Sequence, residues 1–131
     1  MQTALHYFLH FGFPLFIALC FFRKDWKKVY LILIATMLVD LDHLLANPIF
    51  QANRCSINFH LLHSFYVMWI YLVLLFLKRP FNIIGIGLVL HMLTDFIDCM
   101  IMFSNCQACH AEASAFDLLN DTWYVLQFFI N

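Results

Sequence analysis

Residues 81–103 read FNIIGIGLVLHMLTDFIDCMIMF, and this stretch decides the class of the protein. It is long enough to cross a bilayer as a helix, which takes about 20 mostly apolar residues. It also carries His91, Asp95 and Asp98, whose spacing places them on one helix face. An ionisable side chain within a membrane helix is costly, and it usually marks a functional position. The stretch therefore predicts a membrane helix with a polar, functional face.

The composition of the whole chain supports this reading. Of the 131 residues, 64% are hydrophobic and 11% are charged, against roughly 45–50% and 25% in soluble domains. A soluble domain this small would expose large apolar patches and aggregate. A net charge of −1 offers no basic surface to nucleic acid. We expect a single domain over residues 1–131, with membrane lipid as its partner, no nucleic acid, and a homo-oligomer left open.

Three more apolar stretches complete the predicted fold, an all-α integral membrane four-helix bundle. Pro14 is expected to kink the first helix, and Asn47-Pro48 ends the second. Gly85 and Gly87 are expected to allow close helix contact. The tail is too polar to cross a bilayer and predicts a short interfacial helix. The predicted spans are about 4–22, 29–46, 59–77 and 81–103, with the interfacial helix at about 114–130.

The basic residues predict the orientation of the bundle. Six of the seven lie in two loops, residues 23–28 and residues 78–79. The positive-inside rule makes those loops cytoplasmic, so both termini face outward. We expect a multi-pass protein of the bacterial inner membrane whose outward side faces the periplasm or the exterior. The N-terminus lacks the basic start and the cleavage site of a signal peptide, so the first span is expected to be retained.

Ionisable residues converge toward the outward end of all four predicted spans. They lie near the N-terminal end of the first and third spans and near the C-terminal end of the second and fourth, which run in the opposite direction. Imidazole nitrogens and carboxylate oxygens suit Zn, and also Mn, Fe or Ni. We therefore predict a divalent metal site, with zinc first among the metals and two ions as an option. The candidate ligands are His6, His10, Asp40, Asp42, His43, His60, His63, His91, Asp95 and Asp98.

Two alternatives accompany the metal prediction. Each imidazole on its own could simply hydrogen-bond a neighbour, and each Asp could serve a proton relay. Within the set, Asp42 lies about 200° around an α-helix from Asp40 at 100° per residue. It either faces another helix or orients a ligand without touching the metal.

Three elements of this pattern resemble a known family. They are Asp40-Leu41-Asp42-His43, then His60-x-x-His63-Ser64, then His91-x-x-x-Asp95. The series resembles the bacterial membrane-bound metal-dependent hydrolases of the inner-membrane, LexA-regulated type, with His6 or His10 matching the family's early His. The element His60-x-x-His63-Ser64 differs from the family, which has H-R-G-x-x-H-S there. The segments from Arg54 to His60 and from His91 to Cys99 also resemble a small uncharacterised four-helix branch.

The resemblance implies a hydrolase, and the position of the site near the outer leaflet favours a lipid or a lipid-linked phosphate or ester as substrate. A bound metal would activate water. Asp42 or Asp98 is the predicted general base, Ser64 a hydrogen-bond partner at the catalytic site, and Arg54 a phosphate-binding residue or a surface charge. The alternatives are a metal-ion binding or transport protein and a structural metal clip in a membrane subunit.

The cysteines add two expectations. A bridge between Cys55 and Cys99 would clamp a loop beside the site, in a compartment that permits disulfides. The run Cys106-Gln107-Ala108-Cys109-His110 has the spacing of c-type haem attachment. For this run we favour a local disulfide or free thiols over haem.

Overall fold

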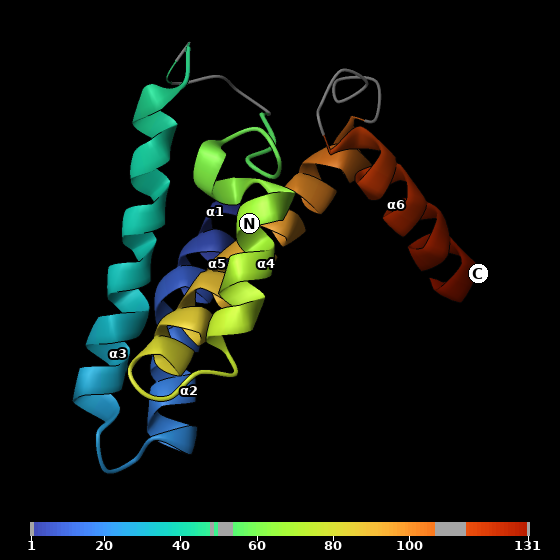
Figure 1. Ribbon diagram of the computed structural model, residues 1–131. Coiled ribbons are helices and arrows are strands. Elements are labelled where there is room, and N and C mark those ends of the chain that lie inside the picture. Colours follow the sequence, from blue (N-terminus) through green and yellow to red (C-terminus); the bar gives the residue numbers. More distant parts are fainter. Residues whose placement is uncertain (1, 48, 50–53, 107–114, 131) are drawn as a thin grey trace.

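The computed structural model describes residues 2–47, 49, 54–106 and 115–130. This part of the chain is helical and contains no strand (Figure 1), which confirms the all-α prediction for it. The elements are α1 (Gln2–Tyr7), η1 (Phe8–Gly12), α2 (Phe13–Phe21), α3 (Trp26–Ala35), η2 (Thr36–Leu45), η3 (Leu61–His63), α4 (Phe65–Leu74), α5 (Phe81–Asn105) and α6 (Phe116–Ile130).

Helix α5 is the central element, and α1, η1, α3, η2, α4 and α6 all contact it (Figure 1). Two glycines on α5 allow this close packing. A Cβ at Gly85 would lie 2.9 Å from the backbone nitrogen of Leu75, and one at Gly87 would lie 2.6 Å from Thr36 Oγ1. These separations are too short for any side chain, so the expected role of both glycines is confirmed.

The first predicted span forms one helical run, α1–η1–α2, with a π-helical turn at Phe8–Gly12. Pro14 follows that turn at the start of α2. Proline has no N–H to donate to the carbonyl four residues earlier, and the change of winding just before it accommodates this loss. The π-helical turn contains the buried His10.

The second predicted span is α3 followed directly by η2, a 3₁₀-helix of 10 residues. Figure 1 shows the two as one rod along a side of the bundle. At a rise of about 1.5 Å per α-helical residue and about 2.0 Å per 3₁₀ residue, the rod is about 35 Å long. Runs of 3₁₀-helix this long are uncommon, and this one carries Asp40, Asp42 and His43.

The third predicted span differs most from the structure. Its α-helix begins at Phe65 rather than near residue 59, because His60 and Ser64 both have extended backbone, with ψ of 152° and 149°. The N–H of Asn58 donates to the carbonyl of His63 at 2.9 Å and closes a loop there. The prediction that His60 and His63 lie within the helix of the third span, at about 59–77, was therefore wrong.

In the described part of the chain, two helices are long and apolar enough to cross a membrane, Thr3–Phe21 and Phe81–Asn105. Phe65–Leu74 is apolar but shorter. The two basic loops meet at one end of the molecule, where the Arg79 guanidinium lies 3.6 Å from the Asp25 carboxylate. The predicted arrangement of loops thus agrees with the structure at this end.

The tail forms helix α6, as predicted, and Figure 1 shows it leading away from the bundle. Leu119 is fully buried against Phe103 and the Cys55–Cys99 disulfide, within one apolar cluster. Beyond that anchor, Phe128, Phe129 and Ile130 are each about 80% exposed. An apolar surface of this kind suits a lipid interface, which stays a prediction for α6.

The structure contains the predicted disulfide between Cys55 and Cys99. It ties the loop after η2 to α5. Cys20 is free, and Cys106 is disulfide-bonded, whereas Cys109 and His110 lie outside the described residues.

We expect mass mapping of unreduced protein to find the peptides of Cys55 and Cys99 joined. Cys20 should be alkylated in the same sample without reductant, because its thiol is free and exposed. Recovery of Cys55 and Cys99 as separately alkylated peptides from folded, unreduced protein would contradict the disulfide.

Candidate metal centre

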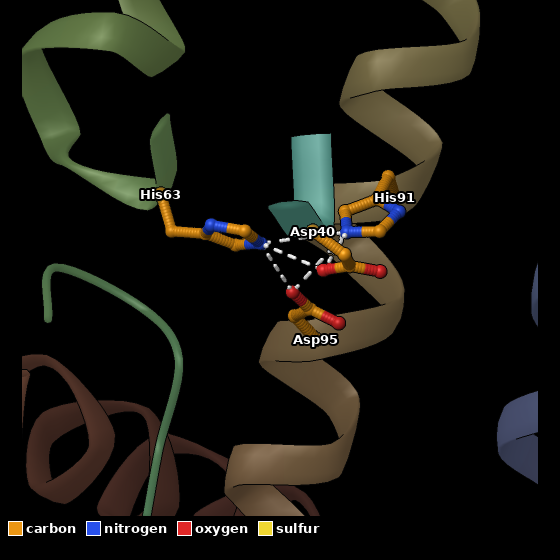
Figure 2. A group of neighbouring side chains, drawn as sticks. All are labelled: Asp40, His63, His91 and Asp95. Atoms are coloured by element: carbon orange, nitrogen blue, oxygen red, sulfur yellow. Dashed lines mark hydrogen bonds and ion pairs between the residues drawn. The ribbon is translucent and has the colours of Figure 1, made fainter. Parts of the chain in front are cut away.

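Four of the predicted ligands come together in one cluster, Asp40, His63, His91 and Asp95, called the cage below (Figure 2). Asp40 comes from η2, His63 from η3, and the other two from successive turns of α5. Because an α-helix has 3.6 residues per turn, a spacing of four residues points His91 and Asp95 to the same side.

The four donor atoms of the cage lie close to one another (Figure 2). Asp95 Oδ2 lies 2.9 Å from His63 Nε2 and 3.5 Å from His91 Nε2. Asp40 Oδ1 lies 3.1 Å from His91 Nε2 and 3.5 Å from His63 Nε2. The two imidazole nitrogens are 3.4 Å apart.

These separations fit a tetrahedral ion. With metal–ligand bonds near 2.0–2.1 Å, the donors of a tetrahedral zinc lie about 3.3 Å apart. The five separations above fall between 2.9 and 3.5 Å. Asp95 Oδ2 is also buried without a hydrogen bond among the described residues. The cage therefore has the donor set and the spacing of a metal site.

Asp42 fixes the tautomer of the His63 ring, that is, which ring nitrogen carries the hydrogen. Its Oδ2 accepts from the backbone N–H of Leu62 at 2.7 Å and lies 3.2 Å from His63 Nδ1. A carboxylate only accepts hydrogen bonds, so Nδ1 carries the hydrogen and a neutral His63 offers the Nε2 lone pair to the cage. A carboxylate that orients a ligand histidine in this way is common at metal sites. Of the two alternatives predicted for Asp42, this geometry agrees with the one in which Asp42 orients a ligand without touching the metal.

The burial of the cage is uneven. The side chains of His63 and His91 are 0% exposed and that of Asp95 is 8% exposed, whereas that of Asp40 is 44% exposed. The cage is thus closed on the α5 side and open at Asp40. A cavity of about 260 Å³ also reaches Asp95, and we call it the polar cavity because His6, Ser56 and Asp98 line it as well.

His10, His6 and Asp98 lie beside the cage. His10 is buried, its Nε2 lies 3.7 Å from Asp95 Oδ1, and neither of its ring nitrogens has a hydrogen bond within the described chain. His6 Nδ1 pairs with Asp98 Oδ2. His6, Asp98 and Asp95 line the polar cavity together. His10, His6 and Asp98 are therefore neighbours of the cage, on the side of α1 and η1.

Asp42, His43 and His60 form a second group with donor atoms within 4.8 Å of one another. The rings of His43 and His60 stack at 3.8 Å with an angle of 26°. The lone pairs of stacked rings lie in two nearly parallel planes, so one ion cannot lie close to both planes at about 2 Å from a nitrogen of each ring. This geometry favours hydrogen bonding over metal binding, and a second ion at this group stays a prediction.

The 3₁₀ winding of η2 explains why Asp40 and Asp42, which are only two residues apart, point to different groups. A 3₁₀-helix has 3.0 residues per turn, so residues three apart eclipse. Asp40 and His43 therefore lie in line, with His43 Nδ1 3.5 Å from Asp40 Oδ1. Asp42 points elsewhere and reaches the His63 ring from its other edge.

Two further predicted residues, Arg54 and Ser64, are not members of the cage. The Arg54 guanidinium donates to the carbonyl of Ile49 at 2.8 Å and lies over the Phe59 ring. Ser64 precedes α4, and its side chain makes no capping hydrogen bond there. Their roles in binding and catalysis stay predictions.

Sequence reasoning missed Ser56, whose Oγ lies 3.1 Å from His43 Nε2. It lies next to Cys55, which was already expected to bridge to α5, so its place beside the site was within reach. It also missed the N–H of Leu62 as a partner of Asp42, because no side-chain pattern reveals a backbone donor.

Comparison with known proteins yields one match. None of the curated proteins and none of the solved structures compared with the chain matches it. A family model described as a family of unknown function (DUF6122) matches residues 1–102, which include every residue of the cage and its surroundings. The chain therefore belongs to this family of unknown function, DUF6122.

Proposed function

We propose that the protein is a membrane-embedded, metal-dependent hydrolase with one divalent ion, zinc first among the candidates, in the cage. Its site would lie near the outer leaflet and act on a lipid or a lipid-linked phosphate or ester. The observation that carries this proposal is the cage itself, four nitrogen and oxygen donors from η2, η3 and α5 at tetrahedral spacing.

The distribution of apolar side chains supports the membrane location. Large apolar residues are exposed along α2, α3 and α4, in an amount that a soluble monomer would not leave uncovered. Examples are Phe16, Phe21, Leu31, Tyr66, Trp69, Ile70 and Val73. The basic loops meet at the end of the bundle where α5 begins, and the positive-inside rule would then turn the other end of a four-span bundle outward.

Uneven burial of the cage favours catalysis over a purely structural site. A structural zinc keeps four protein ligands, whereas a catalytic zinc keeps a position for water or expands to five ligands. Asp40 is the exposed ligand, so it is the one that can yield or share its position. When bound, the ion would acidify a water and polarise a substrate oxygen. Asp95 and His63 would hold the ion, with Asp42 orienting His63.

The test is elemental analysis combined with a hydrolysis assay on the full chain. We expect close to one equivalent of a divalent metal in purified protein, because the cage offers four converging donors. We expect release of fatty acid or phosphate from phospholipid vesicles, with a metal-dependent part that is lost after chelation and restored by the metal. Asp40→Ala should keep most of the metal, because three buried ligands remain, and should change turnover.

Each alternative has its own result. Protein without bound metal at saturating zinc would reject the proposal, because the four groups would then form only an ion-pair network of imidazoles and carboxylates. Stoichiometric metal without turnover of either lipid class would favour the structural clip. Metal flux across proteoliposomes would favour transport.

A further inference from the structure

Ser56, His43 and Asp42 form a continuous chain of hydrogen-bonding groups. Ser56 Oγ lies 3.1 Å from His43 Nε2, and His43 Nδ1 lies 3.2 Å from Asp42 Oδ1. The carboxylate can only accept, so His43 Nδ1 carries the hydrogen and Nε2 is the acceptor for the Ser56 hydroxyl. This is the order of a serine nucleophile, a histidine base and an orienting acid.

The loop that carries Ser56 is held at several points. Cys55 is bonded to Cys99 of α5. The Ser56 carbonyl accepts from the N–H groups of Phe59 and His60 at 3.2 and 3.3 Å. Asn58 has φ of 56°, a left-handed conformation that Asn tolerates better than most residues. Ser56 is therefore placed in advance, as a nucleophile requires.

Substrate access to Ser56 comes from the polar cavity of about 260 Å³ described above. Ser56 shares its lining with Asp95 of the cage and with Asp98. Among the residues that line it, no Lys or Arg appears, whereas two carboxylates do. With no Lys or Arg to bind a phosphate, and with Asp98 already paired to His6, this lining suits a neutral carboxylic ester. Thr3 adds a hydroxyl donor on the same lining.

We propose that Ser56 is the nucleophile of a Ser56–His43–Asp42 triad that hydrolyses carboxylic esters of lipids. Ser56 Oγ bonds to the ester carbonyl carbon and passes its proton to His43 Nε2. The bond from that carbon to the alcohol oxygen then breaks, and the alcohol leaves with the proton. Water next attacks the acyl-serine through the same histidine, which releases the acid and restores the hydroxyl. The proposal goes beyond the proposed function, because it assigns a second hydrolytic group that shares the cavity of the cage but does not require the metal.

The experiment uses the full chain in detergent with a fluorophosphonate probe, which phosphonylates an activated serine with loss of fluoride. We expect one label per chain, mapped by mass spectrometry to Ser56. Ser56→Ala should abolish the label, and His43→Ala should slow labelling at least about 100-fold. Ser104→Ala is the matched control, because Ser104 is exposed and donates only to the carbonyl of Ile101. It should label like the unmodified protein.

The unmodified protein alone can overturn the proposal, so it does not depend on the folding of any variant. A folded, disulfide-intact protein that carries no label on Ser56 would reject the triad. So would labelling that proceeds at the same rate in His43→Ala. Metal content measured in the same preparation separates the two proposals, since failure of labelling in metal-loaded protein leaves the cage intact, and labelling of metal-free protein leaves the triad intact.

Discussion

His63→Ala is expected to abolish stoichiometric metal binding. The His63 nitrogen lies within 3.5 Å of the donor atoms of Asp40, His91 and Asp95, so its loss opens one corner of the cage. The remaining donors are one imidazole and two carboxylates, one of them largely exposed, whereas Asp40→Ala keeps both imidazoles and the buried Asp95 carboxylate. We expect the affinity for zinc to fall by more than about 100-fold, beyond the 10–100-fold loss typical of a residue that only orients a ligand.

Two further variants test whether the loss of metal is specific to the His63 donor. Asp42→Ala should weaken binding by about 10–100-fold, because it removes the partner of His63 Nδ1 and leaves all four donors. Ser104→Ala, a change at an exposed residue outside the cage, should retain the metal. Competition titration against a chelator measures all three affinities. Equal affinities for His63→Ala and the unmodified protein would show that the metal binds elsewhere.

Gly85→Val is expected to destabilise the bundle strongly. A Cβ at Gly85 already meets the backbone nitrogen of Leu75 at 2.9 Å, and backbone cannot move aside as a side chain can. The larger residue must push α4 away from α5. Overpacking of this kind costs about 1–3 kcal/mol or more in the free energy of unfolding. Thermal unfolding in detergent, followed by circular dichroism, would record the loss.

The matched control is Gly12→Ala, whose new Cβ would meet only the Phe8 ring at 2.7 Å. Phe8 is 58% exposed, so its ring can swing away at little cost. We expect a much smaller change in melting temperature than for Gly85→Val. Equal melting temperatures for Gly85→Val and the unmodified protein would mean that α4 and α5 do not pack this closely.

The sequence predicted best where α-helical periodicity holds. The span at 81–103 matches α5, and the alignment of His91 with Asp95 follows from that helix alone. The prediction failed at His60 and His63, because extended backbone at His60 and Ser64 replaces the helix there. Apolar composition detects a membrane-like stretch, but it does not show where local hydrogen bonds make a loop more stable than a helix.

The sequence predicted which residues gather at the candidate site, but not how their side chains are arranged there. Convergence of the ten ligands toward one end follows from the alternating direction of the spans. The ligands divide into a cage, an orienting carboxylate and a stacked histidine pair. This division depends on the 3₁₀ winding of η2, whereas the prediction assumed the 100° per residue of an α-helix. Ser56 comes from a loop whose path is set by a disulfide to a residue 44 positions away.

The winding of η2 has a mechanical consequence. If its ten residues rewound into an α-helix, the rod would shorten by about 5 Å, since the rise per residue falls from about 2.0 to about 1.5 Å. The same change would swing His43 by about 60° out of line with Asp40, since the turn per residue drops from 120° to 100°. An ion held by Asp40 would oppose that contraction. The length of η2 and the binding of metal in the cage would therefore depend on each other.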